Sequence, residues 1–299
     1  STLLWKSSGR RAFAMASRDH RRFAIVETLS DVNNNLYLVR RGKKGKPALL
    51  TKHQGDARYQ PTGFSPDGKT LFYKSDAEGE FFALYSIDLK RKKTKKVLAE
   101  NWDVDAGRYT RGGRYFFTLT NVDGTFKASF RDVKKNAPAK LPTLPGGAGL
   151  VVVHSSKSDR YLGGYLLTDT APTSLYVIDM EKQNLRKLVE VLPKSLAKRP
   201  MVAGKSVRVP SFDKWKVPAF VYTPKRAEGA KGLLPAVIDV HGGPTYQSRR
   251  NFDGFRQYLV SKGYVVMVPN VRGSTGYGKT YTQLDNLDLG GGPLKDIVH

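Results

Sequence analysis

A degenerate repeat of about 46 residues, running from residue 13 to about residue 190, limits the folds open to this chain more than any other feature. Its first landmark is a polar turn that leads into a β-type run. The equivalent apolar positions after this turn are Phe23, Leu71, Phe116 and Leu162. They are spaced by 48, 45 and 46 residues. The second landmark is an acidic residue at the end of a strand-like run, at Asp88, Asp132 and Asp179, and it keeps the same period.

The repeat unit has the composition of strands and turns. Tyr, Phe, Val and Leu fill its runs, Asp-Gly and Gly-Gly pairs separate them, and residues 70–74 alternate with a period of two. This pattern excludes a solenoid of helix pairs and suits the four-stranded blade of a β-propeller. We therefore predict a partial β-propeller with about four visible blades in residues 1–200, and we expect the parent protein to contain more.

A different pattern begins near Lys198-Arg199-Pro200, which is a candidate hinge. The runs at 207–212 and 217–224 read as a β-hairpin that turns at Asp213-Lys214-Trp215. We therefore place a domain boundary here and predict that residues 201–299 form a second domain.

A β-α-β unit follows the hairpin. Residues 235–240 and 264–269 are apolar runs of strand length, and the helix between them is expected to end at Gly263. The residues expected on the buried face of this helix are Phe252, Phe255, Tyr258 and Leu259. Two strands connected through a helix lie parallel in one sheet, with a right-handed crossover.

The loop after the first of these strands reads His241-Gly242-Gly243-Pro244. An α/β-hydrolase places part of its oxyanion hole in this loop, because backbone N–H groups must face the oxygen that becomes negative in the tetrahedral intermediate. Glycine lets the backbone approach the substrate closely and adopt positive φ angles. Gly243 and its neighbour Gly242 are therefore the oxyanion-hole candidates, and the alternative is an ordinary glycine-rich turn.

Two further motifs follow in order, NVRGSTGYG at residues 270–278 and GGGPLKD at residues 290–296. With the propeller, the hairpin and the HGGP loop, they make the chain resemble the prolyl oligopeptidase family of serine peptidases, nearest its acylaminoacyl-peptidase-like and dipeptidyl-peptidase-like branches. The resemblance implies a propeller that caps an α/β-hydrolase domain, with only the N-terminal part of that domain in this chain. It also implies that His241, Arg272 and Tyr277 shape the loops near the site.

The Ser-Asp-His triad that the resemblance implies is absent from the sequence. No GxSxG occurs, and the nucleophile is expected roughly 35 residues after Asp296, with the acid and the histidine later still. Ser274 does not fill the gap, because its glycines stand at −1 and +2 rather than −2 and +2. His241 precedes the expected serine, although the order in this fold is Ser, acid, His. We therefore expect a fragment that does not hydrolyse peptides by itself.

Charge and composition exclude further functions. The net charge is +25, but the densest basic clusters, at residues 40–46 and 90–96, fall in predicted hairpin turns, which favours a solvated surface over nucleic-acid binding. The chain has no cysteine and its histidines show no ligand spacing, so neither a metal nor a cofactor is implied. No apolar run is long enough to span a membrane. The compartment stays open between the cytoplasm and the periplasm or secretion, as does homo-oligomerisation.

The leading hypothesis is a serine-type peptidase that acts on peptide substrates, with the activity belonging to the parent protein. One alternative is a noncatalytic propeller that binds partners and carries a degenerate hydrolase remnant. Another is an esterase or acyl hydrolase that uses the same oxyanion loop. A downstream GxSxG followed by Asp and His would favour the first hypothesis over the second.

Overall fold

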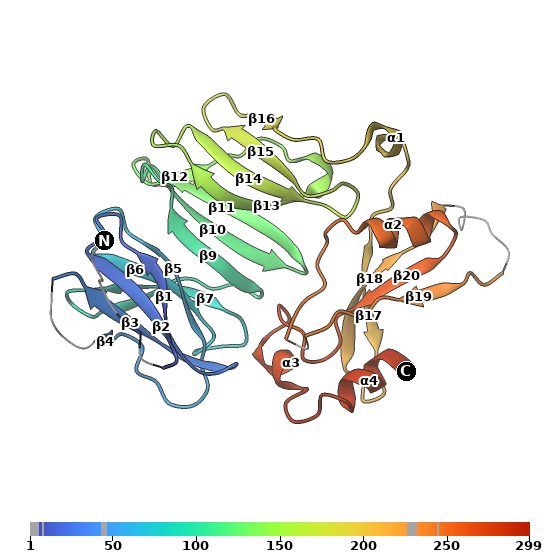
Figure 1. Cartoon of the computed structure of the whole chain (residues 1–299), viewed down its shortest axis with the longest axis horizontal. Coiled ribbons are helices and arrows are strands. Elements are labelled where there is room, and N and C mark those ends of the chain that lie inside the picture. The colour runs from blue at the N-terminus through green and yellow to red at the C-terminus, as the bar shows by residue number, and fades with distance from the viewer. Residues whose placement is uncertain (1–5, 8, 43–46, 226–231, 244) are drawn as a thin grey trace. The chain divides into compact units, whose positions relative to one another are not determined.

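The computed structural model describes residues 6–7, 9–42, 47–225, 232–243 and 245–299 (Figure 1). Pro244 of the HGGP loop and residues 43–46 of the first basic cluster lie outside the described residues. Four four-stranded sheets come first. The first sheet contains β1 (Arg11–Ala16), β2 (Arg22–Ser30), β3 (Asn33–Arg40) and β4 (Ala48–Leu49), and the second contains β5 (Tyr59–Phe64), β6 (Thr70–Ser75), β7 (Ala83–Asp88) and β8 (Thr94–Leu98). The third contains β9 (Asp103–Tyr109), β10 (Tyr115–Val122), β11 (Thr125–Asp132) and β12 (Ala137–Ala139). The fourth contains β13 (Gly149–Ser155), β14 (Tyr161–Leu167), β15 (Ser174–Asp179) and β16 (Asn184–Lys187).

The strand pattern confirms the repeat. In each of the four sheets the strands pair in chain order, as propeller blades do. Each residue of the first landmark is the second residue of the second strand of its sheet; these residues are Phe23, Leu71, Phe116 and Leu162. Asp88, Asp132 and Asp179 each end the third strand. Asp88 shows why an acidic residue recurs there, because its carboxylate accepts the backbone N–H groups of Lys90 and Arg91 at 2.8 Å in the turn that follows.

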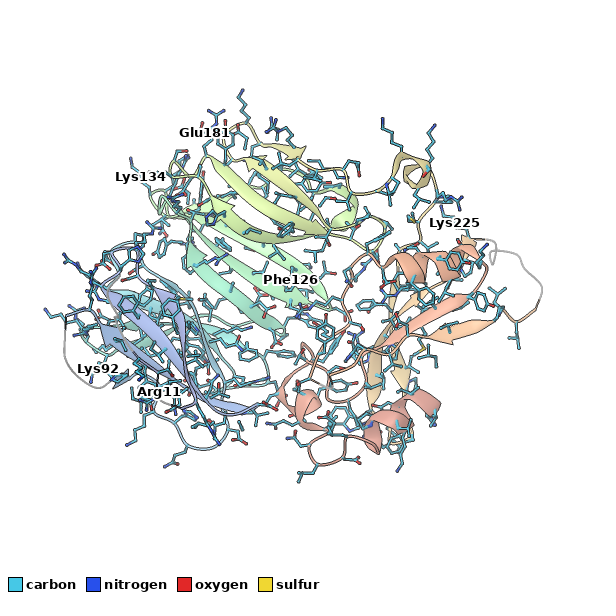
Figure 2. The ribbon with its side chains drawn as sticks, in the orientation of Figure 1. Arg11, Lys92, Phe126, Lys134, Glu181 and Lys225 are labelled. Carbon is cyan, nitrogen blue, oxygen red and sulfur yellow. The ribbon has the colours of Figure 1, made fainter. Side chains whose placement is uncertain are left out.

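The second basic cluster lies partly in a turn, as predicted. Residues 90–93 connect β7 to β8 and are exposed, with Lys92, labelled in Figure 2, at a φ of 57°. Lys95 and Lys96 differ from the prediction, since they belong to strand β8 and are exposed there. Strand β8 is at the edge of its sheet, where lysine side chains in water oppose pairing with another chain.

The fifth sheet is mixed, and its order is β17-β18-β20-β19. Its strands are β17 (Lys205–Pro210), β18 (Lys216–Tyr222), β19 (Ala236–Ile238) and β20 (Val265–Pro269). The predicted hairpin is present as antiparallel β17 and β18, and β19 lies parallel to β20, as expected for a β-α-β unit. The helical segments are η1 (Pro145–Gly147), α1 (Lys194–Ala197), α2 (Gly254–Ser261), α3 (Lys279–Gln283) and α4 (Gly292–Val298).

The buried face of α2 differs in part from the expected one, although Leu259 packs against the core of the sheet as predicted. Phe255 and Tyr258 are 70% and 54% exposed, whereas Arg256, Gln257 and Val260 are buried. Val260 packs with Phe220, Tyr222, Val266 and Val268 in the core of the sheet. Apolar spacing alone misplaced this face because the two buried polar side chains find partners: Arg256 reaches Asp239, and Gln257 pairs with the backbone of Val202. The helix does end as predicted, with Gly263 at a φ of 97° just beyond it.

The chain divides into two compact units. The first comprises Ser1–Thr120, Ala128–Lys140 and His154–Arg160, and the second comprises Asn121–Lys127, Leu141–Val153 and Tyr161–His299. The second unit therefore holds the β10–β11 turn and most of the fourth sheet together with the mixed sheet. The predicted boundary between residues 1–200 and residues 201–299 stays a prediction. In the described part of the chain, no helix is both long and apolar enough to cross a bilayer.

Candidate active site

The HGG segment lies at the carboxyl end of β19, inside the second unit. Asp239 continues the pairing of this strand, since its N–H donates to the Met267 carbonyl at 2.8 Å. Gly242 and Gly243 follow, and both are exposed. Gly243 has a φ of 143°, and a Cβ there would stand 3.0 Å from Tyr246 Cβ. Its backbone therefore favours glycine, whereas a Cβ on Gly242 would meet nothing within 4 Å.

His241 connects this loop to the NVRGSTGYG segment. Its Nε2 is 3.0 Å from Ser274 Oγ, and its Nδ1 is 3.0 Å from the Gly242 carbonyl oxygen. Ser274 is fully buried and donates its hydroxyl proton to the Val271 carbonyl at 2.6 Å. The imidazole also contacts the Tyr246 ring edge to face, at 5.5 Å between centroids. These contacts suit a residue that orders the loop. They also engage the Ser274 hydroxyl in hydrogen bonds within the protein.

Asn270 fastens the segment after the glycines. Its side-chain amide copies a backbone pairing: Oδ1 accepts the Ser248 N–H at 2.7 Å, and Nδ2 donates to the Ser248 carbonyl at 3.1 Å. Nδ2 also donates to the Tyr277 hydroxyl at 3.1 Å. Asn270 is fully buried, so these bonds form away from water, where leaving them unmade would be costly. The residues after both parallel strands are thereby held together.

Arg272 binds two carboxylates from distant parts of the chain. Its Nη1 and Nη2 donate to Asp213 in the β17–β18 turn at 2.8 and 2.9 Å. Its Nε and Nη2 donate to Asp296 in α4 at 3.0 and 2.7 Å, and its backbone N–H donates to the same carboxylate at 2.9 Å. The guanidinium also covers the Phe212 ring at 4.8 Å. These two carboxylates raise the pKa of Arg272 and Arg272 lowers that of Asp213, so the side chain is a permanently charged brace.

Tyr277 packs beneath the same loop. Its ring meets Tyr281 edge to face at 5.9 Å, and the Arg208 guanidinium lies 5.6 Å from its centroid. Burial raises the pKa of its hydroxyl, so Tyr277 stays neutral at physiological pH. His241, Arg272 and Tyr277 thus contact the structure that surrounds the glycine loop, and their loop-shaping roles remain predictions.

A cavity of about 330 Å³ opens beside His241 within the second unit. Its walls come from the loop after β19, the start of α2, and two residues of the propeller-type sheets, Phe126 on β11 and Leu167 at the end of β14. Figure 2 labels Phe126 on its strand. Charged groups in the wall include the ion pair between Arg256 and Asp239, at 2.9 Å. Phe126, Leu167 and Tyr246 supply the apolar part of the wall, and the other residues that line the cavity are polar or charged.

Several residues of this region were not found from the sequence. Buried Gln247 accepts from Asn121 Nδ2 at 2.7 Å and from Arg249 Nε at 3.0 Å. Asn121 precedes Gln247 by 126 residues, so no local pattern could connect them. The one available signal was the Asn121-Val122-Asp123-Gly124 turn, which marks a hairpin but not what the hairpin touches. Within the described residues, no group of three or more acidic or histidine side chains is arranged to hold a metal ion.

Residues 250–299 match the model of the prolyl oligopeptidase family. Over these residues the chain is similar to members of that family. Dipeptidyl aminopeptidase BIII of Pseudoxanthomonas mexicana is 28% identical over 246 residues, which cover 80% of this chain and 35% of that protein. Dipeptidyl-peptidase 5 of Trichophyton schoenleinii is 26% identical over 257 residues, which cover 79% of this chain and 33% of that protein. The chain thus spans about a third of the length of the curated relatives it matches.

Solved structures of peptidases share its fold. A puromycin-hydrolysing peptidase of Mycobacterium tuberculosis superimposes with a TM-score of 0.75 at 19% identity, over 97% of this chain and 46% of that one. The acylaminoacyl peptidase of Pyrococcus horikoshii gives 0.68 at 18% identity, over 98% of this chain and 45% of that one. With the sheets described above, these similarities confirm a partial β-propeller followed by the N-terminal part of an α/β-hydrolase domain.

Proposed function

We propose that the protein containing this chain is a serine-type peptidase, and that the N–H groups of Gly243 and Gly242 form part of its oxyanion hole. The main support is the conformation of Gly243, which has a φ of 143° and is exposed at the carboxyl end of a parallel strand. A backbone held in this region by glycine carries donors that are oriented before the substrate arrives, which is what stabilises a developing oxyanion.

The surrounding bonds support the same role. The loop is fixed through His241 to Ser274, and the following segment is fixed through Asn270 to Ser248. The cavity beside His241 offers room for a substrate group next to the glycines. The sequence contains no GxSxG, so residues 1–299 alone are expected to bind peptides without hydrolysing them.

The test is a Gly243→Ala substitution in the whole protein, assayed on dipeptidyl and N-acylaminoacyl p-nitroanilides and on a p-nitrophenyl ester. We expect kcat for the anilides to fall roughly 100-fold, the scale on which loss of one oxyanion donor acts. Gly55→Ala is the matched control, because Gly55 also has a positive φ, of 70°, and a Cβ there meets nothing within 4 Å. It places an alanine at another positive φ away from the site.

Three outcomes would contradict the proposal. Cleavage of the ester without cleavage of any anilide would indicate an esterase. Absence of all hydrolysis by the whole protein would indicate a noncatalytic propeller. Equal kcat values for the Gly243→Ala and Gly55→Ala proteins would remove Gly243 from the oxyanion hole.

A further inference from the structure

Arg249 is a cavity cation for which the described residues provide no carboxylate partner. The other charged side chains of the wall are engaged: Arg256 pairs with Asp239 at 2.9 Å, and Asp253 caps helix α2 by accepting the Arg256 N–H at 2.8 Å. Arg249 is partly buried, donates through Nε to Gln247, and places its guanidinium 4.8 Å from the Phe126 ring centroid. None of these contacts uses its Nη1 or Nη2.

The guanidinium is oriented before any ligand binds. Gln247 is 2% exposed, and its Oε1 accepts both from Asn121 in the β10–β11 turn and from Arg249 Nε, which fixes one edge of the guanidinium. The Phe126 ring supports the face. The same turn also holds the backbone, since the Gly124 carbonyl accepts the N–H of the residue after Arg249 at 3.1 Å. Such preorganisation lowers the entropic cost of binding a ligand.

We propose that Arg249 binds a carboxylate of the peptide substrate close to the bond that is cleaved. The two free Nη groups match the two oxygens of a carboxylate, and a partly buried site strengthens the charge-assisted bonds. His241 lines the same cavity, and the oxyanion-hole candidates follow it directly in the chain. The carboxylate belongs either to an Asp or Glu side chain or to the C-terminus of a short peptide. This subsite rests on the proposed peptidase function.

Binding to the 299-residue chain tests the subsite without requiring catalysis. The probes are Ac-Ala-Glu-Ala-NH2, Ac-Ala-Gln-Ala-NH2 and Ac-Ala-Gln-Ala-OH, titrated by calorimetry. We expect one carboxylate peptide to bind about 10- to 100-fold more tightly than the neutral peptide, as charged hydrogen bonds allow. The Glu and C-terminal arms then show which carboxylate is recognised.

The variants separate recognition from folding. Arg249→Gln should remove the preference for the carboxylate while leaving the Kd of the neutral peptide unchanged. Arg249→Lys should keep part of the preference, because an ammonium retains the charge without the planar fork. Phe126→Leu, which removes the aromatic support but no charge, should also reduce it in part. Lys262→Gln makes the same charge change outside the cavity and should have no effect.

Three results would overturn the subsite: equal Kd values for all three peptides on the unmodified chain, no saturable binding of any of them, or an Arg249→Gln chain that loses all peptides equally. The proposed peptidase function fails separately, through absence of hydrolysis by the whole protein. A carboxylate preference that depends on Arg249 would stand even then.

Discussion

Removal of Arg272 should destabilise the second unit more than a surface arginine would, because two carboxylates depend on it. The Arg272 side chain is 7% exposed and that of Asp296 is 1% exposed, whereas that of Asp213 is 32% exposed. In Arg272→Ala, the Asp296 carboxylate remains buried with no guanidinium. Removing one partner of a buried ion pair costs about 3–5 kcal/mol, and we expect a loss in this range.

Arg272→Lys tests the geometry rather than the charge. One ammonium cannot make the four side-chain contacts that the guanidinium makes to the two carboxylates. We therefore expect a loss of about 2 kcal/mol, equivalent to one charged hydrogen bond. Arg91→Ala, in the exposed β7–β8 turn, is the matched control and should change stability by no more than about 0.5 kcal/mol.

The assay is urea unfolding followed by the fluorescence of Trp215. This residue lies in the β17–β18 turn close to Asp213, and its ring meets Tyr281 edge to face at 6.1 Å. The other two tryptophans, Trp5 and Trp102, are replaced by Phe so that the signal reports on this region. A loss of less than about 1 kcal/mol in Arg272→Ala would refute the reasoning, because it falls below the cost of a broken buried pair.

A double-mutant cycle adds a stricter criterion. Asp296→Asn removes the buried charge that Arg272→Ala leaves behind, so the double variant should be more stable than the sum of the single losses by at least about 1 kcal/mol. Additive losses would mean that the two side chains do not act as a pair.

The pH dependence of stability provides an independent check. Arg272 lowers the pKa of Asp213, so this pair stabilises the fold above the ordinary Asp pKa, and the contribution is lost as pH falls through the lowered value.

Two other substitutions test single buried carboxylates. Asp285 Oδ2 is buried with no hydrogen-bond partner in the described structure, and burial raises the pKa of this carboxyl. The folded state therefore holds its proton to higher pH than the unfolded state, so stability should fall as pH rises through the raised pKa, and Asp285→Asn should remove that slope in urea midpoints measured from pH 4 to 8. Asp159 is fully buried and accepts from Thr110 Oγ1 and from the N–H groups of Gly112 and Arg114, at 2.7–2.8 Å. Asp159→Ala removes the acceptor of these donors and of Ser155 Oγ, which donates at 3.1 Å, and should cost at least about 3 kcal/mol by Trp102 fluorescence; a loss below about 1 kcal/mol would show that water replaces the carboxylate.

The propeller sheets could be predicted because their information is local and repeated. Leu71 follows a turn that Ser65 and Asp67 close within a few residues, with Ser65 Oγ donating to Asp67 at 2.6 Å and accepting the Thr70 N–H at 3.0 Å. Turns of this kind are encoded by short polar side chains that bond to nearby backbone, so a sequence shows them directly. The period then needed only equivalent positions in successive units.

The buried face of α2 could not be predicted in the same way. Apolar periodicity assumes that large apolar side chains face the core, yet Phe255 is exposed and Gln257 is buried. Gln257 bonds to the backbone N–H and carbonyl of Val202 and to the Asp169 carbonyl, so burial leaves its amide satisfied. These partners lie 55 and 88 residues away in the chain, and the helix sequence carries no sign of them.

The candidate site shows the same division within one loop. The need for glycine at position 243 is a backbone property, and it was visible from the glycine pair after a strand. The orientation of Arg249 depends instead on Asn121, Phe126 and Gln247, which meet only when a propeller turn folds against the loop. The glycine motif therefore shows where the backbone needs glycine, whereas the contacts that orient Arg249 depend on long-range packing and leave no sign in the local sequence.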